Sequence, residues 1–460
     1  MMDRFEQIID LLNNLVWGPP LIILLIAIGV YLTIRTRALQ FRYLVYAHKL
    51  AFTRHDDNAQ GDISHFQALM TALAATIGIG SITGVATAIA IGGLGALFWM
   101  WVAALVGMAT KYGEAILAIK YRTTDENGEM CGGPMYYIER GMGWKWLAAI
   151  FAILGIGASF GIGNLVQSNS VSLAVQDLFG VGPLWTGIIL MGLVGFALIG
   201  GIKSIGKIVG LLVPAMAVFY IIGGLLIIFL KIEAVPAAFV LIFRSAFSGQ
   251  AATGGFIGAT VMMAIQFGIS RGVFSSEAGL GSSSIAAAAA QTDTPGRQAL
   301  VSMCSVFITT GIVCTITGLV IAVSGVLGEL GPDGQMLDGS AMALRAFDSI
   351  LPYGGLIVTI ALIPFAYSTI LGWAYYGEKC IEYLCGIRTI KVYRVLFTLL
   401  VFPGAFLSMK LVWNLANMLN GLMAFPNLIA LFALTGVIAK ETRFFEGILK
   451  KEKLARKKNR

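Results

Sequence analysis

Long apolar stretches separated by short polar ones follow one another along almost the whole chain of 460 residues. About eleven of these stretches have the length and composition of membrane-spanning helices. They cover residues 17–34, 66–90, 95–121, 144–177, 183–201, 204–231, 254–290, 296–326, 352–384, 391–408 and 410–439. The pattern predicts an all-α polytopic membrane protein with eleven transmembrane helices. No small-residue cleavage site follows the first stretch, which we therefore expect to be a retained helix rather than a signal peptide.

Two of the predicted helices carry glycine and hydroxyl residues where lipid would favour leucine. Residues 76–84 read TIGIGSITG, and residues 266–281 read QFGISRGVFSSEAGLG. A helix that breaks at membrane depth frees backbone N–H and C=O groups, which must then meet protein, water or a bound solute. Paired breaks of this kind are typical of ion-coupled transporters, whose substrate lies between the broken helices.

The two interrupted helices also divide the chain. After the first helix, the remaining ten form two sets of five, and each set opens with an interrupted helix. Because five is odd, the two sets must cross the bilayer in opposite directions, which is the arrangement of an inverted repeat. We therefore predict an N-terminal helix and cytoplasmic loop in residues 1–60, a first repeat in 61–231, a second repeat in 232–439 and a basic cytoplasmic tail in 440–460.

Composition and charge support a membrane protein with a defined orientation. Only 12% of the residues are charged, against about 25% in soluble domains, which leaves little room for a soluble domain. The net charge of +8 comes largely from the C-terminal KKEKLARKKNR, which favours contact with anionic lipid over nucleic acid. The acidic segment 327–350 should face outward. With the basic tail in the cytoplasm, eleven spans place the N-terminus outside.

Four further motifs carry a family resemblance. They are GGLGALFWMWVAALVG at residues 92–107, GGPMYYIERG at 132–141, RGVFSSEAGLGSSSIAAAAA at 271–290 and STILGWAYYGEKC at 368–380. Together they closely resemble the alanine or glycine:cation symporter family. The resemblance implies a leucine-transporter type of fold, a 5+5 inverted repeat with one extra N-terminal helix, in a prokaryotic plasma (inner) membrane. It also implies sodium-driven, sometimes proton-driven, import of alanine, glycine and related small amino acids.

Two positions depart from the family pattern and bear on the identity of the substrate. Ser81 and Ser276 stand where members commonly have asparagine. Each change replaces an amide with a hydroxyl at the edge of the expected site.

The resemblance implies a substrate site between the broken helices. Backbone amides at the first break should take the carboxylate of an amino acid, and carbonyls of the second should take its ammonium. Trp373 would form one wall of the pocket, and Phe160 is a weaker candidate for the wall. Gln167 and Asn164 are polar groups within a span, and such groups usually face the bundle or the transport pathway. The alternative is that the glycines serve close helix packing. The expected substrate contacts are Gly78, Ile79, Gly80, Ser81, Phe160, Gln167, Gln266, Gly268, Ile269 and Trp373.

A sodium site is expected beside the substrate. Phe365, Ser368 and Thr369 have the spacing i, i+3, i+4, so that one carbonyl and two hydroxyls share a helix face. In the resembling fold such a trio meets carbonyls of the first broken helix, which by position are those of Ala74 and Ile77. The alternative is that the two hydroxyls only bond back to their own helix.

The sequence therefore predicts a sodium-coupled symporter for small neutral amino acids that works by alternating access, with Na⁺ as the coupling ion and no other cofactor. Proton coupling, or another substrate such as serine or glutamine, is the alternative. A channel would need charge rings or a carbonyl filter, and an enzyme would need a nucleophile with its base or paired metal ligands. Neither pattern occurs in a predicted span. The oligomeric state stays open.

Two pairs of charged residues have other expected roles. Lys111 and Glu114, spaced i, i+3, are expected to form an ion pair near the lipid headgroups, with a part in an inner gate as the alternative. Arg271 and Glu277 are expected to stabilise the second broken helix or to close the cytoplasmic side.

Overall fold

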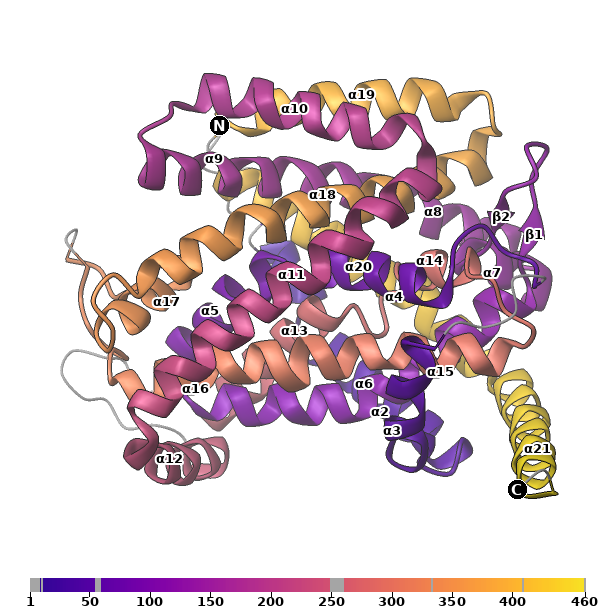
Figure 1. The fold of residues 1–460 in the computed structure, drawn as a ribbon, viewed down its shortest axis with the longest axis horizontal. Coiled ribbons are helices and arrows are strands. Elements are labelled where there is room, and N and C mark those ends of the chain that lie inside the picture. The colour runs from indigo at the N-terminus through magenta and orange to yellow at the C-terminus, as the bar shows by residue number, and fades with distance from the viewer. Residues whose placement is uncertain are drawn as a thin grey trace.

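The computed structural model describes residues 9, 11–53, 59–248, 260–331, 334–407 and 409–458. These residues are almost entirely helical, and strands β1 (Thr123–Thr124) and β2 (Met130–Cys131) form a small antiparallel hairpin (Figure 1). The helices of the first half are α2 (Pro19–Arg35), α3 (Leu39–Ala51), α4 (His65–Thr76), the 3-10 turn η1 (Ile79–Ser81), α5 (Thr83–Gly92), α6 (Gly95–Lys120), α7 (Pro134–Met142), α8 (Lys145–Phe160), the π-helical turn η2 (Gly161–Leu165), α9 (Val166–Phe179), α10 (Pro183–Ile199) and α11 (Gly201–Leu230). Those of the second half are η3 (Ile232–Ala234), α12 (Val235–Ser248), α13 (Val261–Ser276), α14 (Ser284–Ala288), α15 (Pro295–Val306), the π-helical η4 (Phe307–Cys314), α16 (Thr315–Ser324), α17 (Gly339–Asp348), α18 (Gly355–Cys385), α19 (Thr389–Gly404), α20 (Met409–Ala433) and α21 (Thr435–Lys458).

The helices are long and apolar enough for a multi-pass membrane protein. Within the described residues, seven helices could cross a membrane, and the bent pair made of α4 and η1–α5 brings the number to eight. The other three predicted spans coincide with α10, α13 and α19, which have 17, 16 and 16 residues, a little short of the roughly 20 residues of a full span. Residues 254–259 of one of them, and residue 408 of another, lie outside the described residues. The count of eleven thus stays a prediction.

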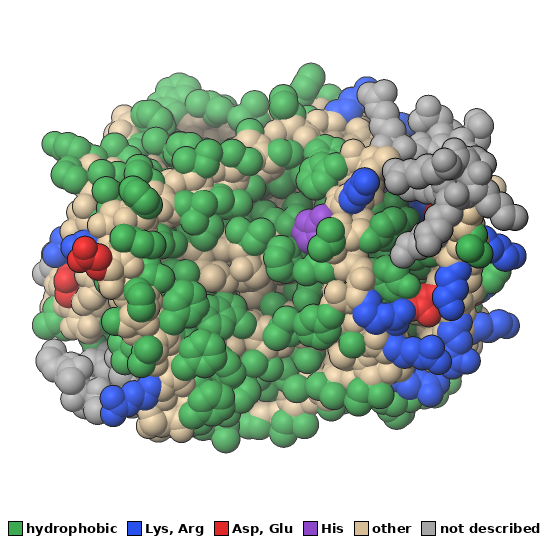
Figure 2. Space-filling view, turned by 60° about the horizontal axis from the view of Figure 1, so that its bottom comes forward, with side chains coloured by type: hydrophobic (Ala, Val, Ile, Leu, Met, Phe, Trp, Pro, Cys, Tyr) green, Lys and Arg blue, Asp and Glu red, His purple; other side chains and the backbone are tan. Residues whose placement is uncertain are grey.

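The outer surface has the apolar character that lipid requires. Phe196 on α10 and Leu211 and Phe229 on α11 are more than two thirds exposed, and hydrophobic side chains cover most of the face in Figure 2. Basic side chains gather at the right end of that face. In Figure 1, α17 and α21 lie at opposite ends of the molecule, so the acidic and the basic segments are far apart.

The two interrupted segments meet at one end of the bundle. Ile63, just before α4, pairs in parallel with Ala290, just after α14. The amides of Asp62 and Ile63 donate to the Ala289 carbonyl at 2.8 and 3.2 Å. These contacts fix the start of the first interrupted helix against the end of the second, although more than 200 residues separate them.

Candidate functional site

The first interruption falls at Ile77 and Gly78, between α4 and η1. Gly78 is extended (φ −130°, ψ −156°), and the helical segments on either side meet at an angle of 66°. The break predicted within residues 76–84 is therefore present. It restarts a helix at Ile79, and the first N–H groups of a helix have no partner in their own segment. The amides of Ile79 and Gly80 accordingly find no acceptor within the described residues, whereas the Ser81 amide donates to the Gly78 carbonyl at 3.1 Å.

The second interruption occupies only the last part of the stretch in which it was predicted. Helix α13 continues without a break to Ser276, so the carbonyls of residues 266–269 belong to a regular helical hydrogen-bond ladder. These carbonyls were expected to be free to accept from a substrate, and the continuous helix corrects that expectation. The chain leaves the helix at Glu277, Gly279 and Gly281, whose φ values of +55°, +97° and +82° are left-handed and end the ladder.

Two charged residues of α6 hold this irregular segment in place. One oxygen of Glu114 accepts hydrogen bonds from the amides of Gly279 and Gly281 at 2.9 and 3.1 Å and from Asn427 at 2.7 Å. Lys111 donates to the carbonyl of the last residue of α13 at 2.8 Å. Both side chains are at most 1% exposed. The prediction of an ion pair near the headgroups is therefore wrong. Each of the two side chains instead bonds to backbone groups that lose their helical partners at the break.

A cavity of about 20 Å³ lies between the two interruptions. This volume is close to what a single water molecule needs, so the walls must move apart before an amino acid can enter, as alternating access requires. The cavity is lined by Ala75, Thr76, Gly78, Ile79, Gly80, Ile162, Gln167, Phe274, Glu277, Thr369, Trp373 and Asn420.

Half of the residues predicted to contact a substrate line this cavity. They are the backbone positions Gly78, Ile79 and Gly80 with the side chains of Gln167 and Trp373. The structure does not bring the other half to it; these are Ser81, Phe160, Gln266, Gly268 and Ile269.

Ser81 and Phe160 have partners elsewhere. The Ser81 hydroxyl lies 3.0 Å from that of Ser275, so it joins the two interrupted helices. The ring of Phe160 packs on that of Tyr393, with centroids 5.4 Å apart. Asn164, the other polar residue of that predicted span, donates to a backbone carbonyl of α19 at 2.6 Å.

The three residues of α13 do not line the cavity. A Cβ on Gly268 would lie 2.4 Å from the Ala96 carbonyl oxygen of α6, so the glycine permits close helix packing, the alternative weighed above. Ile269 is buried. Gln266 lines a separate hollow of about 50 Å³ together with Arg271.

Six lining residues were not predicted as site residues: Ala75, Thr76, Ile162, Phe274, Glu277 and Asn420. A signal existed for three of them. Phe274 and Glu277 stand three apart in the motif RGVFSSEAGLG, so they share a face at the end of the helix. Asn420 is a polar residue within an apolar span, and such residues usually face the interior of a bundle.

Four of the five residues predicted to bind sodium bring their oxygen atoms together next to the cavity. The Thr369 hydroxyl lies 3.0 Å from the carbonyl oxygens of both Ala74 and Phe365. The Ser368 hydroxyl lies 2.9 Å from the Phe365 oxygen and 3.4 Å from that of Ala74. Ile77 is fully buried at the end of α4. The hydroxyls bond back to their own helix and also reach α4, so α18 and the first interruption share these oxygens.

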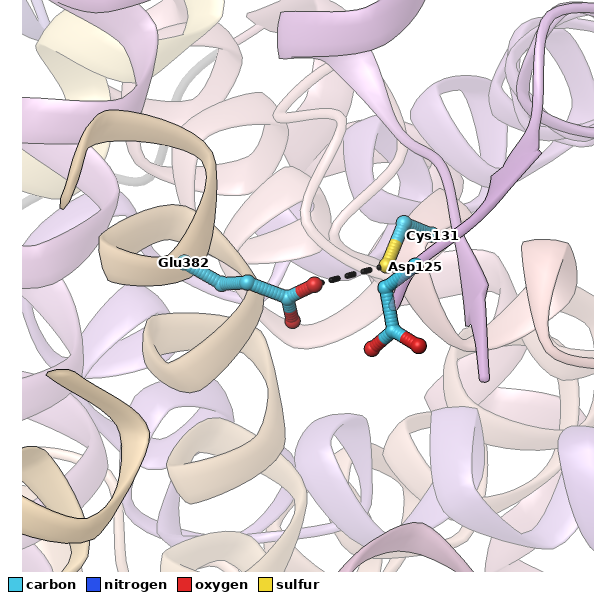
Figure 3. Close-up of side chains that lie close together, drawn as sticks. All are labelled: Asp125, Cys131 and Glu382. Carbon is cyan, nitrogen blue, oxygen red and sulfur yellow. Dashed lines mark hydrogen bonds between the residues drawn. The ribbon is translucent and has the colours of Figure 1, made fainter. Parts of the chain in front are cut away.

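A second polar cluster joins α18 to the β-hairpin. The thiol of Cys131 donates to Glu382 at 2.9 Å, and Asp125 lies beside them (Figure 3). Burial raises the pKa of the Cys131 thiol, which keeps the proton it donates. Lys379 supplies the positive charge, at 2.8 Å from Glu382 and 3.3 Å from Glu129. The cluster is therefore a buried ion network, and the ammonium of Lys379 stands where a metal ion would have to bind.

Comparison with known proteins gives matches along the entire chain. Residues 2–459 match the model of the family described as "Sodium:alanine symporter family". The "Sodium/alanine symporter AgcS" of Methanococcus maripaludis is 55% identical over 453 residues, which cover 97% of this chain and 99% of that one. The "Probable sodium/glutamine symporter GlnT" of Bacillus subtilis is 38% identical over 440 residues, which cover 95% of this chain and 90% of that one.

A solved structure shares the fold. The crystal structure of MhsT in complex with L-phenylalanine superposes with a TM-score of 0.55 at 15% sequence identity, covering 84% of this chain and 99% of that one.

Proposed function

The chain belongs to the sodium:alanine symporter family, and on that premise we propose that it imports small neutral amino acids, alanine and glycine above all, together with Na⁺. The observation that carries the proposal is the small polar cavity between two interrupted helices, with a cluster of oxygen atoms at its edge. Membership of a transporter family argues for a carrier rather than an enzyme. The protein is a multi-pass membrane protein by its family and its apolar helices.

For the substrate, we propose a site in which an amino acid lies across the cavity. The unused amides of Ile79 and Gly80 would donate to its carboxylate, at the positive end of a new helix. Gln167 can adapt to the substrate, because its side-chain oxygen is buried without a partner among the described residues. Trp373, only 2% exposed, would leave room for a methyl group or a hydrogen.

For the coupling ion, we propose that the oxygens of Ala74, Ile77, Phe365, Ser368 and Thr369 bind one Na⁺. Hard cations are held by oxygens, and hydroxyls can rotate their lone pairs toward such an ion. One Na⁺ crossing about 100 mV releases about 2.3 kcal/mol, which supports roughly a fiftyfold accumulation of substrate.

The larger architecture belongs to the same proposal. We propose eleven transmembrane helices with the repeat boundaries given above, the C-terminal segment in the cytoplasm and the N-terminus outside. The likeness to MhsT supports the fold. The separation of the acidic segment around α17 from the basic α21 supports the orientation.

The direct test is uptake of radiolabelled alanine into proteoliposomes under an inward Na⁺ gradient, with K⁺ substitution at constant pH. We expect accumulation only with Na⁺ and competition by glycine. Uptake driven by a pH gradient alone would show that H⁺, and not Na⁺, is the coupling ion. Uptake of glutamine in preference to alanine would instead follow the name of the Bacillus relative.

Substitution of Thr369 by alanine tests the ion site. The change removes one hydroxyl that lies 3.0 Å from two carbonyl oxygens, so one proposed ligand is lost. We expect the Na⁺ concentration for half-maximal uptake to rise about tenfold, equivalent to about 1.4 kcal/mol, with a smaller effect on the melting temperature. The control is Thr359→Ala on the same helix; within the part of the chain that the structure describes, its hydroxyl bonds only to the Gly355 carbonyl, at 3.2 Å. An unchanged Na⁺ requirement in Thr369→Ala would speak against this ion site.

Substitution of Trp373 by alanine tests the pocket wall. The indole packs edge-to-face on Tyr376, with centroids 5.6 Å apart, and lines the cavity. Removing it opens space, so we expect leucine to become a competitor of alanine uptake. Truncation of a buried tryptophan also costs about 3–5 kcal/mol of stability, and competition is therefore measured at a temperature where the variant stays folded. If leucine still fails to compete in Trp373→Ala, the wall that limits substrate size is formed by other residues.

A further inference from the structure

Glu277 is the ionisable side chain that faces the cavity. Among the twelve lining residues it alone carries a charge, and it is 2% exposed. It comes directly after α13, where the second interruption begins. The Ser282 hydroxyl donates a hydrogen bond to its carboxylate at 2.8 Å. This contact holds the carboxylate in place, and Trp373 lines the same cavity.

The backbone at Glu277 is strained in a way that positions this side chain. Its φ of +55° and ψ of 17° are left-handed, a conformation that costs a residue with a Cβ about 1–2 kcal/mol. Glycine or asparagine usually stands at such a helix end. Strained residues of this kind concentrate at ligand-binding positions. A glutamate is therefore a residue type that the helix end by itself does not favour.

The charged groups nearest Glu277 come from α6. Lys111 of α6 lies close enough to interact with both Glu277 and Glu114, and Tyr376 of α18 interacts with Glu277. One oxygen of Glu114 already accepts three hydrogen bonds from the irregular segment and Asn427. One ammonium thus stands against two buried carboxylates, and the carboxylate of Glu277 is the one that borders the cavity.

The cavity also has lining residues of the complementary polarity. Ile79 and Gly80 line it, and their amides find no acceptor within the described residues. Two N–H donors and one carboxylate around the same cavity match the two ends of a zwitterion. We propose that the Glu277 carboxylate binds the ammonium group of the substrate and so selects α-amino acids over α-hydroxy acids. This inference rests on the proposed amino-acid transport.

The test compares alanine with lactate, which has a hydroxyl in place of the ammonium. Binding of each is measured by calorimetry on the purified full-length protein in Na⁺ buffer, for wild type and Glu277→Gln. Glutamine keeps the size of the side chain, and its loss of charge leaves Lys111 balanced by Glu114. We expect alanine affinity to fall tenfold to a hundredfold, as for loss of a hydrogen bond to a charged group, with lactate affinity changed much less. Glu277→Asp should recover part of the loss.

Two further variants keep the result interpretable. Glu114→Gln retains an oxygen for the amides of the irregular segment and does not line the cavity, so it should keep the wild-type ratio of alanine to lactate affinity. Glu277→Asn is suited to the left-handed backbone, so it tests the same loss of charge if Glu277→Gln does not fold.

Three results would overturn the assignment. Equal losses for alanine and lactate in Glu277→Gln would show a structural role. An unchanged ratio with a weaker Na⁺ dependence would assign the carboxylate to the coupling ion. Absence of alanine binding by the wild type would overturn the proposed function itself, whereas wild-type binding with an unchanged ratio in the variants overturns only the role of Glu277.

Discussion

Substitution of Gly78 by alanine is expected to lower sodium-driven alanine uptake about tenfold to a hundredfold while the protein stays folded. A Cβ on Gly78 would lie 2.5 Å from the Thr369 hydroxyl oxygen, far inside normal contact. The hydroxyl would have to leave the Ala74 and Phe365 carbonyls, and overpacking of this kind costs about 1–3 kcal/mol. The backbone of Gly78 is extended and suits any residue, so the effect is steric and local to the site.

The measurement combines uptake in proteoliposomes with the melting temperature of the purified variant. Gly84→Ala is a matched control in the same motif, because a Cβ there would have its nearest neighbour at 3.9 Å, an ordinary contact. We expect the control to transport like wild type. Normal sodium-driven uptake by Gly78→Ala would show that the Thr369 hydroxyl can move without consequence, and it would remove this cluster from the ion site.

Substitution of Lys379 by methionine is expected to destabilise the protein by about 3–5 kcal/mol, the usual result of removing one partner from a buried ion network. The Lys379 side chain is fully buried, and its ammonium lies 2.8, 3.3 and 3.8 Å from carboxylate oxygens of Glu382, Glu129 and Asp125. Methionine fills similar space but leaves these carboxylates facing one another. The melting temperature should drop, and amide protection in the hairpin of residues 123–131 should decrease first.

Two further variants test whether the loss of stability comes from the buried charges. Lys145→Met removes a lysine that is 80% exposed and 3.9 Å from Glu139, and it should change stability by less than about 1 kcal/mol. The double variant Lys379→Met with Glu382→Gln should recover part of the loss, because it removes one of the unpaired charges. If Lys379→Met melts like wild type, the hairpin and α18 are held together by other contacts.

Composition and local spacing were sufficient to predict the parts of this protein that depend on neighbours in the chain. The apolar stretches predicted a polytopic membrane protein, because only regular helices satisfy the backbone in lipid. The glycines of residues 76–84 predicted the first interruption. The spacing of Ser368 and Thr369 predicted two hydroxyls on one helix face, and both reach the Ala74 carbonyl.

Tertiary structure alone decided how distant segments complete the site. Residues 266–269 have the glycine and polar composition of a break, yet α13 stays helical through them, and α6 packs closely on Gly268. The chain leaves the helix only at Glu277, where Glu114 and Asn427 supply partners for freed backbone groups. Asn420 joins the cavity from a helix more than 300 residues away from Gly78. A helix breaks where other helices can replace its hydrogen bonds, and those partners come from contacts that the linear order of residues does not specify.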